Sequence, residues 1–109
     1  MKIRFIYPFL FLIFPIFIAA GTTGKIKGLV LDKETNSPII GANVFLESTT
    51  LGTVTDENGN YFIINVPPGV YTLRVSYIGY STVIIKNISV SIDRSSIRDI
   101  YMEMEIIEG

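Results

Sequence analysis

Residues 52–80 read GTVTDENGNYFIINVPPGVYTLRVSYIGY, and the spacing of their apolar side chains indicates how the chain folds. From Tyr71 to Tyr77, apolar side chains occupy every second position and alternate with polar ones. A period of two is typical of a β-strand with one buried side and one side facing water. The stretch therefore predicts two strands, at 60–66 and 70–78, separated by a short turn.

Two sets of turn residues interrupt the alternation. Asn58-Gly59 follows Asp56, and glycine adopts positive φ at little cost, so we expect a hairpin in which Asp56 accepts backbone N–H groups. Pro67-Pro68-Gly69 predicts a rigid turn rather than a proline-rich ligand, which needs a longer exposed run. The structural turn residues are Asp56, Asn58, Gly59, Pro67, Pro68 and Gly69.

The same period of two recurs along the rest of the chain, and no window indicates a convincing helix. Turn signals fall every ~8–12 residues, which is typical of an all-β sandwich or barrel. We predict an all-β sandwich of seven strands, near 25–32, 42–48, 52–55, 60–66, 70–78, 82–90 and 97–106. In the last of these strands, the side chains expected to point inward are Ile100, Met102, Met104 and Ile106.

The first twenty residues have a different character from the rest. Lys2 and Arg4 precede an apolar run, 5–18, and small residues ending at Gly21 follow it. This layout is typical of a cleavable signal peptide, so we predict a signal peptide at 1–21 and one domain at 22–109. Cleavage is expected after Gly21, with the position after Ala20 as the alternative.

A membrane anchor is the other interpretation of this run. It is shorter than the ~20 residues that a spanning helix needs, and Pro8 and Pro15 interrupt it. Export with cleavage is therefore the better prediction. The chain contains no cysteine, which excludes an N-terminal lipid anchor and disulfides, so a packed core or a neighbouring protein must hold the domain.

The composition argues against catalysis and against most ligands. Without His or Cys there is no Ser-His-Asp triad, no cysteine nucleophile and no zinc site of the usual ligand types. A calcium loop starting at Asp56 would need a glutamate at its twelfth position, where Pro67 stands. We expect no enzyme activity, no catalytic residues, no cofactor and no metal. The chain has 9 basic and 10 acidic side chains and no basic cluster, so nucleic acid is not an expected partner.

A candidate contact surface follows from the strand pattern. Tyr61 and Ile63 are expected on the inward face of their strand, which places Phe62 and Ile64 on the outer face. Phe45 is expected on the outer face of its own strand. If these three side chains lie close together, they form an apolar patch that a partner would cover.

Five motifs in order resemble the carboxypeptidase regulatory-like domain. They are Gly28-Leu29-Val30-Leu31-Asp32, Pro38-Ile39-Ile40-Gly41-Ala42-Asn43-Val44, Gly52-Thr53-Val54-Thr55-Asp56 with Gly59, Val66-Pro67-Pro68-Gly69-Val70-Tyr71-Thr72-Leu73, and Ser76-Tyr77-Ile78-Gly79-Tyr80. The resemblance spans roughly 25–104. It implies a Greek-key β-sandwich of seven strands, similar to transthyretin (prealbumin).

The resemblance also implies a function. Domains of this family are non-catalytic accessories, and in Bacteroidetes-type bacteria they often follow the signal peptide of TonB-dependent outer-membrane receptors. We therefore expect a periplasmic accessory or docking domain of a nutrient receptor, or a truncated or stand-alone relative. The expected partner is a protein, either the receptor plug and barrel or a periplasmic protein, with membrane contact only through it. Phe62 and Ile64 depart from the polar residues usual at these positions.

Two alternatives come from other classes. An exported module that binds carbohydrate or protein would show exposed tyrosines aligned on one face, whereas Tyr71, Tyr77 and Tyr80 are expected as core or corner aromatics. The accessory domain of a metallocarboxypeptidase usually follows the catalytic domain, which conflicts with a signal peptide directly upstream. The expected location is the periplasm or the periplasmic face of the outer membrane.

Overall fold

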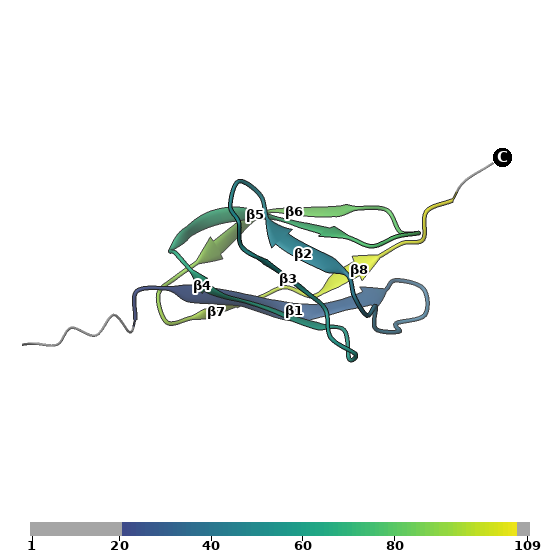
Figure 1. Cartoon of the computed structure of the whole chain (residues 1–109), viewed down its shortest axis with the longest axis horizontal. Helices are drawn as coiled ribbons and strands as arrows, with labels where there is room; N and C mark the ends of the chain where they lie inside the picture. The colour runs from purple at the N-terminus through teal and green to yellow at the C-terminus, as the bar shows by residue number, and fades with distance from the viewer. Residues whose placement is uncertain (1–20, 107–109) are drawn as a thin grey trace, which may run out of the picture.

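Eight β-strands form the part of the chain that the computed structural model describes, residues 21–106. They are β1 (Gly24–Asp32), β2 (Asn43–Leu46), β3 (Gly52–Val54), β4 (Asn60–Val66), β5 (Gly69–Ser76), β6 (Val83–Val90), β7 (Ser95–Ile97) and β8 (Ile100–Met102). Across this range no residue is helical, as the alternation predicts. The strands make two layers that face each other (Figure 1).

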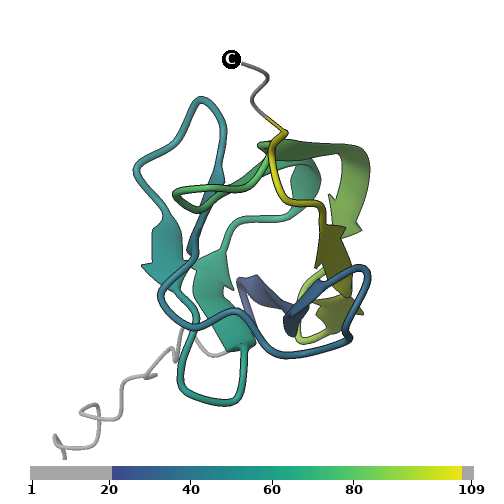
Figure 2. The same cartoon turned by 90° about the vertical axis from the view of Figure 1, so that its right-hand side faces the viewer.

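The two layers are separate sheets of different character. Sheet I has the order β4-β1-β7, and β8 follows β7 along the same edge of β1. Within it, β1 pairs antiparallel with β4 and parallel with β7 and β8. Sheet II has the order β3-β2-β5-β6 and is antiparallel throughout. Figure 2 views the molecule along its length and shows the sheets surrounding a common interior.

The interior is filled by the alternate side chains of both sheets. Tyr61 is the largest fully buried side chain, and Ile63 is 2% exposed, which confirms the predicted inward face of β4. The remaining buried apolar residues are Ile26, Val30, Ile39, Ala42, Val44, Leu46, Val66, Leu73, Val75, Ile88, Val90, Ile100 and Met102. Burial of each large aliphatic side chain stabilises the fold by roughly 1.5–3 kcal/mol. The core thus replaces the missing disulfides as the source of stability.

The predicted last strand is broken into β7 and β8. At the break, Arg98 N–H donates to the Lys27 carbonyl (2.9 Å), and Asp99 Oδ1 accepts the Leu29 N–H (3.0 Å). The Arg98 carbonyl points inward and accepts the Tyr61 hydroxyl at 2.6 Å. It occupies the space where a Cβ on Gly28 would stand. At this point the Asp99 side chain, instead of a backbone carbonyl, accepts the hydrogen bond from the Leu29 N–H of β1. The last strand is therefore interrupted between β7 and β8.

The end of the predicted 97–106 strand is also wrong. Ile100 and Met102 are buried as expected, but Met104 is 65% exposed and Ile106 is 82% exposed. The chain leaves β1 after Met102 and runs beside 79–81 instead, where Ser81 N–H donates to the Glu103 carbonyl (2.9 Å). Because the chain leaves sheet I after Met102, Met104 and Ile106 do not face sheet II and stay exposed.

The other six predicted strands agree with the structure to within two residues at each end. The described segment begins at one end of the molecule, beside β1, and ends at the opposite end, beyond β8 (Figure 1). Residues 1–20, which hold most of the predicted signal peptide, lie outside the described residues. The division into 1–21 and 22–109 therefore stays a prediction.

Candidate contact surface

The turn between β3 and β4 is built around one carboxylate. Asp56 Oδ1 accepts the N–H groups of Asn58 and Asn60, both at 2.9 Å. The Asp56 carbonyl accepts the Gly59 N–H at 2.9 Å, and Gly59 has φ +80°. The turn lies where the sequence predicts, with positive φ at Gly59 alone, but it does not form a β-hairpin. β3 pairs with β2 in sheet II and β4 pairs with β1 in sheet I, so the turn connects the two sheets. Between residues 21 and 106 no group of three or more His, Cys, Asp or Glu side chains is placed to hold a metal ion.

The second predicted turn, Pro67-Pro68-Gly69, connects β4 in sheet I to β5 in sheet II. The Tyr71 hydroxyl donates to the Pro67 carbonyl at 2.6 Å, which ties the start of β5 back to the turn. Tyr71 is half-buried and packs against the core. It is a corner aromatic, as the sequence predicts, and not part of an exposed platform.

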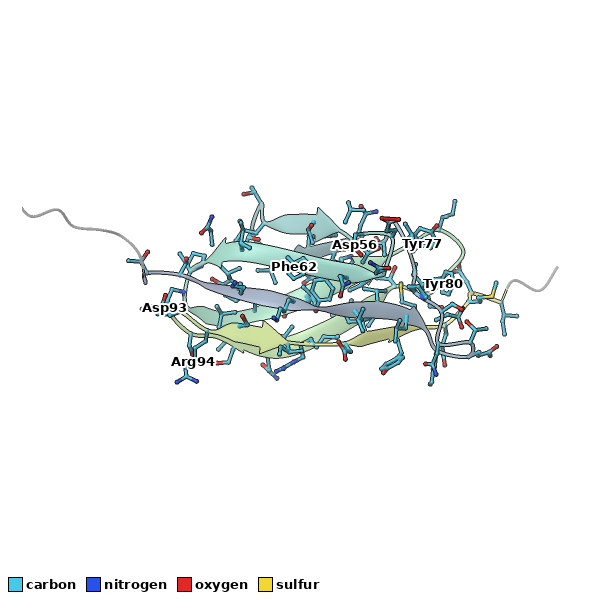
Figure 3. All side chains as sticks on the ribbon, turned by 90° about the horizontal axis from the view of Figure 1, so that it is seen from below. Asp56, Phe62, Tyr77, Tyr80, Asp93 and Arg94 are labelled. Atoms are coloured by element: carbon cyan, nitrogen blue, oxygen red, sulfur yellow. The ribbon has the colours of Figure 1, made fainter. Side chains whose placement is uncertain are left out.

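Tyr77 and Tyr80 lie at the other end of β5, with ring centroids 5.9 Å apart. Both are half-buried, and the Tyr80 hydroxyl donates to Asp32 Oδ2 at 2.6 Å. The Tyr80 hydrogen bond, together with N–H donors from Thr35 and Glu34, lowers the pKa of Asp32 below its ordinary value, and it raises the pKa of Tyr80. Figure 3 labels both rings beside the Asp56 turn. The pair braces this end of the sandwich.

The buried Tyr61 is the other perturbed phenol. Burial raises its pKa, and the nearby charge of Asp99 raises it further. Its hydroxyl is committed to the Arg98 carbonyl, so it serves the core and is not open to a ligand.

Phe62 and Ile64 lie on the outer face of sheet I, as predicted. Phe62 is 52% exposed and Ile64 is 58% exposed. Figure 3 looks from the side of this sheet, with Phe62 labelled on β4. Large apolar side chains at this exposure mark a surface that a partner can cover.

Phe45 does not join them, which corrects the expected grouping. It is on the outer face of β2, opposite Gly52 of β3 and Arg74 of β5, and 37% of it is exposed. Because β2 belongs to sheet II and β4 to sheet I, the outer faces of the two strands point away from each other. The candidate surface therefore consists of sheet I residues.

Sheet I supplies further members that sequence reasoning missed. Lys27 of β1 pairs with Phe62 on one side and with Ile97 of β7 on the other, so the three form one row across the sheet. Leu31 and Tyr101 form a second row farther along. Ile97 is 58% and Tyr101 50% exposed. Only the parallel pairing of β1 with β7 and β8 brings these residues to the face, and local alternation carries no signal for that pairing.

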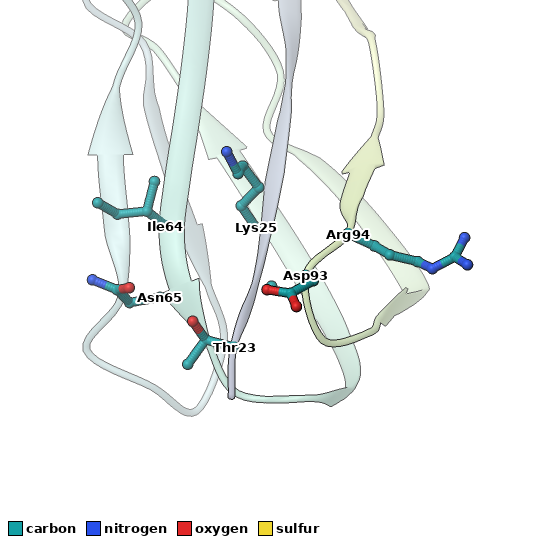
Figure 4. Close-up of a pocket in the computed structure, with 7 residues that line it drawn as sticks. Thr23, Lys25, Ile64, Asn65, Asp93 and Arg94 are labelled. Carbon is teal, nitrogen blue, oxygen red and sulfur yellow. The ribbon is translucent and has the colours of Figure 1, made fainter. Parts of the chain in front are cut away.

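A hollow of about 350 Å³ opens at the end of this surface (Figure 4). It is lined by Thr23, Gly24, Lys25, Ile64, Asn65, Asp93 and Arg94. The Lys25 side chain leans from β1 toward β4, between Ile64 and Asp93 in the view of Figure 4. The hollow therefore combines an apolar side chain of β4 with a cation of β1.

The ion pairs found within residues 21–106 do not involve Lys25 or Lys27. Lys33 pairs with Glu103 at 3.0 Å, and Arg74 pairs with Glu47 at 3.2 Å. Both pairs are solvent-exposed, so each contributes little to stability. In the same range, no helix is long and apolar enough to cross a membrane.

Comparison with known proteins supports the receptor resemblance. The chain is 47% identical over 55 residues to the TonB-dependent receptor SusC of Bacteroides thetaiotaomicron, and 47% identical over 60 residues to the TonB-dependent receptor P39 of Formosa agariphila. These matches cover 50% and 55% of the chain, but the chain spans only 5% of each receptor. Among solved structures, it is 29% identical to a chain of a type II cohesin-X-dockerin complex from Acetivibrio cellulolyticus, with a TM-score of 0.63. That match covers 72% of this chain and 56% of the other.

A family model, that of the CarboxypepD_reg-like domain, matches residues 26–107. It begins within β1 and continues past β8, so it includes both sheets. The chain belongs to the CarboxypepD_reg-like domain family.

Proposed function

We propose that the chain is a non-catalytic accessory domain that docks a TonB-dependent nutrient receptor to a protein partner in the periplasm. It serves either as the N-terminal domain of such a receptor or as a truncated or stand-alone relative. The observation that carries the proposal is the 47% identity to two receptors within a family match that spans the sandwich.

The geometry of the domain supports a docking role better than a catalytic one. Its perturbed groups, Asp32, Tyr61 and Tyr80, are all bonded within the fold. Among the exposed apolar side chains, those of Phe62, Ile64 and Ile97 lie on one face of sheet I and suit a protein contact. The strand orders β4-β1-β7 and β3-β2-β5-β6 also support the proposed Greek-key, transthyretin-like arrangement, in which β7 and β8 count as one interrupted strand.

The tyrosines weigh against the carbohydrate-binding alternative. Tyr71 and Tyr77 lie at opposite ends of β5, and the hydroxyls of Tyr71 and Tyr80 are bonded within the fold. These three rings therefore do not make the aligned, exposed platform that stacks on a sugar.

Fractionation of the native host tests the proposal. An antibody raised against the sandwich should detect it in the outer-membrane fraction, in a chain of receptor size or in a small chain that co-purifies with a receptor barrel. In-frame deletion of 25–106 should then reduce growth on the nutrient of that receptor while the amount of barrel in the membrane stays unchanged.

The control is a deletion strain that carries the intact gene on a plasmid, which should recover growth. Recovery of the sandwich only in the cytoplasm, or normal nutrient-limited growth of the deletion strain, would contradict the proposal. Binding of the chain to a glycan array would favour the carbohydrate module instead.

A further inference from the structure

The unpaired edge of β4 is the feature that the docking proposal leaves unexplained. Val30 N–H donates to the Gly59 carbonyl (2.8 Å), and β4 continues in register with Gly28 opposite Tyr61. Backbone groups of an antiparallel strand point alternately to its two sides. The N–H and C=O groups of Tyr61 therefore face β1, whereas those of Phe62 and Ile64 face the free edge.

Phe62 and Ile64 thus offer both exposed apolar side chains and backbone hydrogen-bonding groups to the same partner. Their side chains are 52% and 58% exposed on the outer face, and their backbone groups lie on the edge where sheet I ends. Across residues 21–106, no hydrogen bond joins these backbone groups to another strand, turn or side chain. A strand that paired with this edge would cover both side chains as it satisfied the backbone.

The other sheet edges are blunted against pairing. β3 has only three residues, and β7 and β8 have three each with a break between them. β6 is longer, but it carries Lys86 and a register shift beside Asn87, whose φ is +61°. Short edges, lysines and bulges are the usual devices against unwanted strand addition.

β4 has few of these devices. Its seven residues, NYFIINV, contain no charge and no proline. β4 does have a register shift against β1, between Ile63 and Val66, where Asn65 has φ +57°, so it shares the bulge of β6 but lacks its lysine. An edge strand that is long, apolar and uncharged is a site for pairing with another chain.

The charges beside β4 indicate what kind of strand fits. Lys27 lies next to Phe62 on β1, and Lys25 leans toward β4 near Ile64. Neither lysine belongs to an ion pair found in residues 21–106. Asp93 is the carboxylate that lines the hollow with Lys25. The positive charge of Arg94, which also lines the hollow, offsets the charge of Asp93. The outer face beside Phe62 and Ile64 therefore combines apolar side chains with two lysines, while the carboxylates of Asp56 and Glu57 lie in the turn before the strand.

We propose that the free edge of β4 binds an extended peptide whose side chains alternate between apolar and acidic. The peptide adds to sheet I as a further strand, pairs its backbone with Phe62 and Ile64, and directs carboxylates toward Lys25 and Lys27. Strand addition of this kind takes affinity from backbone hydrogen bonds and specificity from alternate side chains. The inference rests on the proposed docking function and names its partner chemistry.

A second copy of the chain fits this edge less well. Pairing two β4 strands would oppose uncharged side chains only, so neither lysine would gain a carboxylate.

Two capped synthetic peptides test the proposal with the full chain. One is a seven-residue peptide that alternates valine and glutamate, and the other alternates valine and lysine. We expect the glutamate peptide to bind at least ten times more tightly by fluorescence polarisation. In hydrogen exchange, it should slow the amides of Phe62 and Ile64 and leave those of β6 unchanged.

Variants separate backbone pairing from side-chain contact. Phe62→Pro removes one N–H from the free edge and leaves the β1 ladder intact, as proline is tolerated at sheet edges. We expect it to abolish binding, whereas Phe62→Val keeps the N–H and loses less affinity. Lys25→Glu with Lys27→Glu should reverse the preference between the two peptides. If Phe62→Pro does not fold, hydrogen exchange on the unaltered chain still shows whether the peptide protects the amides of β4.

Several results would overturn the inference. They are equal affinity for both peptides, no binding at millimolar concentration, protection at β6 instead of β4, or a peptide-free dimer that Phe62→Pro disrupts. The last would assign the edge to a second copy. The proposed function is judged separately by location and growth, so peptide binding to β4 in a chain absent from the outer membrane would refute only that function.

Discussion

At the scale of single residues, Gly59 combines a positive φ with a confined position. Its φ is +80°, and a Cβ there would meet Pro38 Cβ at 2.8 Å and the Val30 carbonyl oxygen at 2.9 Å. Its own carbonyl accepts the Val30 N–H. The residue therefore joins the turn between β3 and β4 to β1 in a space that admits no side chain.

Replacement of Gly59 by alanine should be costly. We expect Gly59→Ala to lower the free energy of unfolding by about 2–4 kcal/mol, because a strained φ and an overfilled site each cost ~1–3 kcal/mol. Urea denaturation measures the loss. Gly79→Ala is the matched control, since Gly79 has φ +88° but a Cβ at that position would meet no atom within 4 Å. Equal losses for the two variants would refute the steric argument.

The Asp32–Tyr80 hydrogen bond predicts a pH dependence. Because the pKa of Asp32 is lowered in the fold from its ordinary value of 3.8, its contribution is present above that pH and is lost as the pH falls through the lowered value. Tyr80→Phe removes the hydrogen bond that is the largest cause of the lowered pKa of Asp32. We expect its unfolding midpoint to lie below that of the unaltered chain at neutral pH, and the difference to narrow in strong acid.

Tyr101→Phe is the control for this prediction. Tyr101 is 50% exposed, and within residues 21–106 its hydroxyl makes no hydrogen bond to the protein. This variant should match the unaltered chain at every pH. A Tyr80→Phe deficit that stayed constant from neutral to strongly acidic pH would show that Asp32 is not the group involved.

At the scale of elements, alternation predicts which way a side chain points but not which strand lies beside it. Phe62 and Ile64 were predictable as outward residues because a period of two fixes the face of a strand. Phe45 follows the same rule, yet its strand belongs to sheet II. The pairing of β1 with β7 and β8 joins residues 70 positions apart, so no local pattern places Ile97 beside Lys27.

The break between β7 and β8 was unpredictable for the same reason. It depends on a carbonyl of Arg98 that enters the space over Gly28 and on a hydroxyl from Tyr61. Each of these residues is ordinary in its own segment. The turns, by contrast, were predictable because Asp56, Asn58 and Gly59 make their contacts within five residues of one another.

Gly28 gives a prediction for sheet I as a whole. We expect Gly28→Ala to lower the free energy of unfolding by roughly 1–3 kcal/mol, because overfilling a packed site costs that much. The added methyl group would push Arg98 away from β1 and loosen both β7 and β8. Amide exchange of Arg98 and Ile100 should accelerate more than that of Val75 in sheet II, because the Arg98 N–H donates to the Lys27 carbonyl of β1.

The comparison within one molecule supplies the control. If the Val75 amide accelerated as much as the Arg98 amide, the substitution would act on global stability and not on the β7–β8 edge. If neither changed, the space over Gly28 would be less restricted than the geometry indicates.

At the scale of the whole molecule, export and cleavage remain to be measured. We expect the chain recovered from the periplasm to begin at Thr22, or at Gly21 if cleavage follows Ala20, because small side chains at Ala19 and Gly21 suit the cleavage site. N-terminal sequencing or intact mass decides between the two. An intact Met1 in the membrane fraction would show that residues 1–21 are an anchor.

The position of β1 in sheet I has a consequence for the order of events in folding. β1 is the first strand of the domain to be synthesised, but its parallel partners β7 and β8 are the last. The final pair of this ladder joins Asp32 to Met102. Contacts between such distant segments form slowly, because a long loop must close before they are made. A chain that crosses a membrane from its N-terminus cannot complete sheet I until almost all of the domain has emerged. In a chain that is exported, this topology would keep the domain unfolded while it crosses the membrane, and it would favour folding after the crossing.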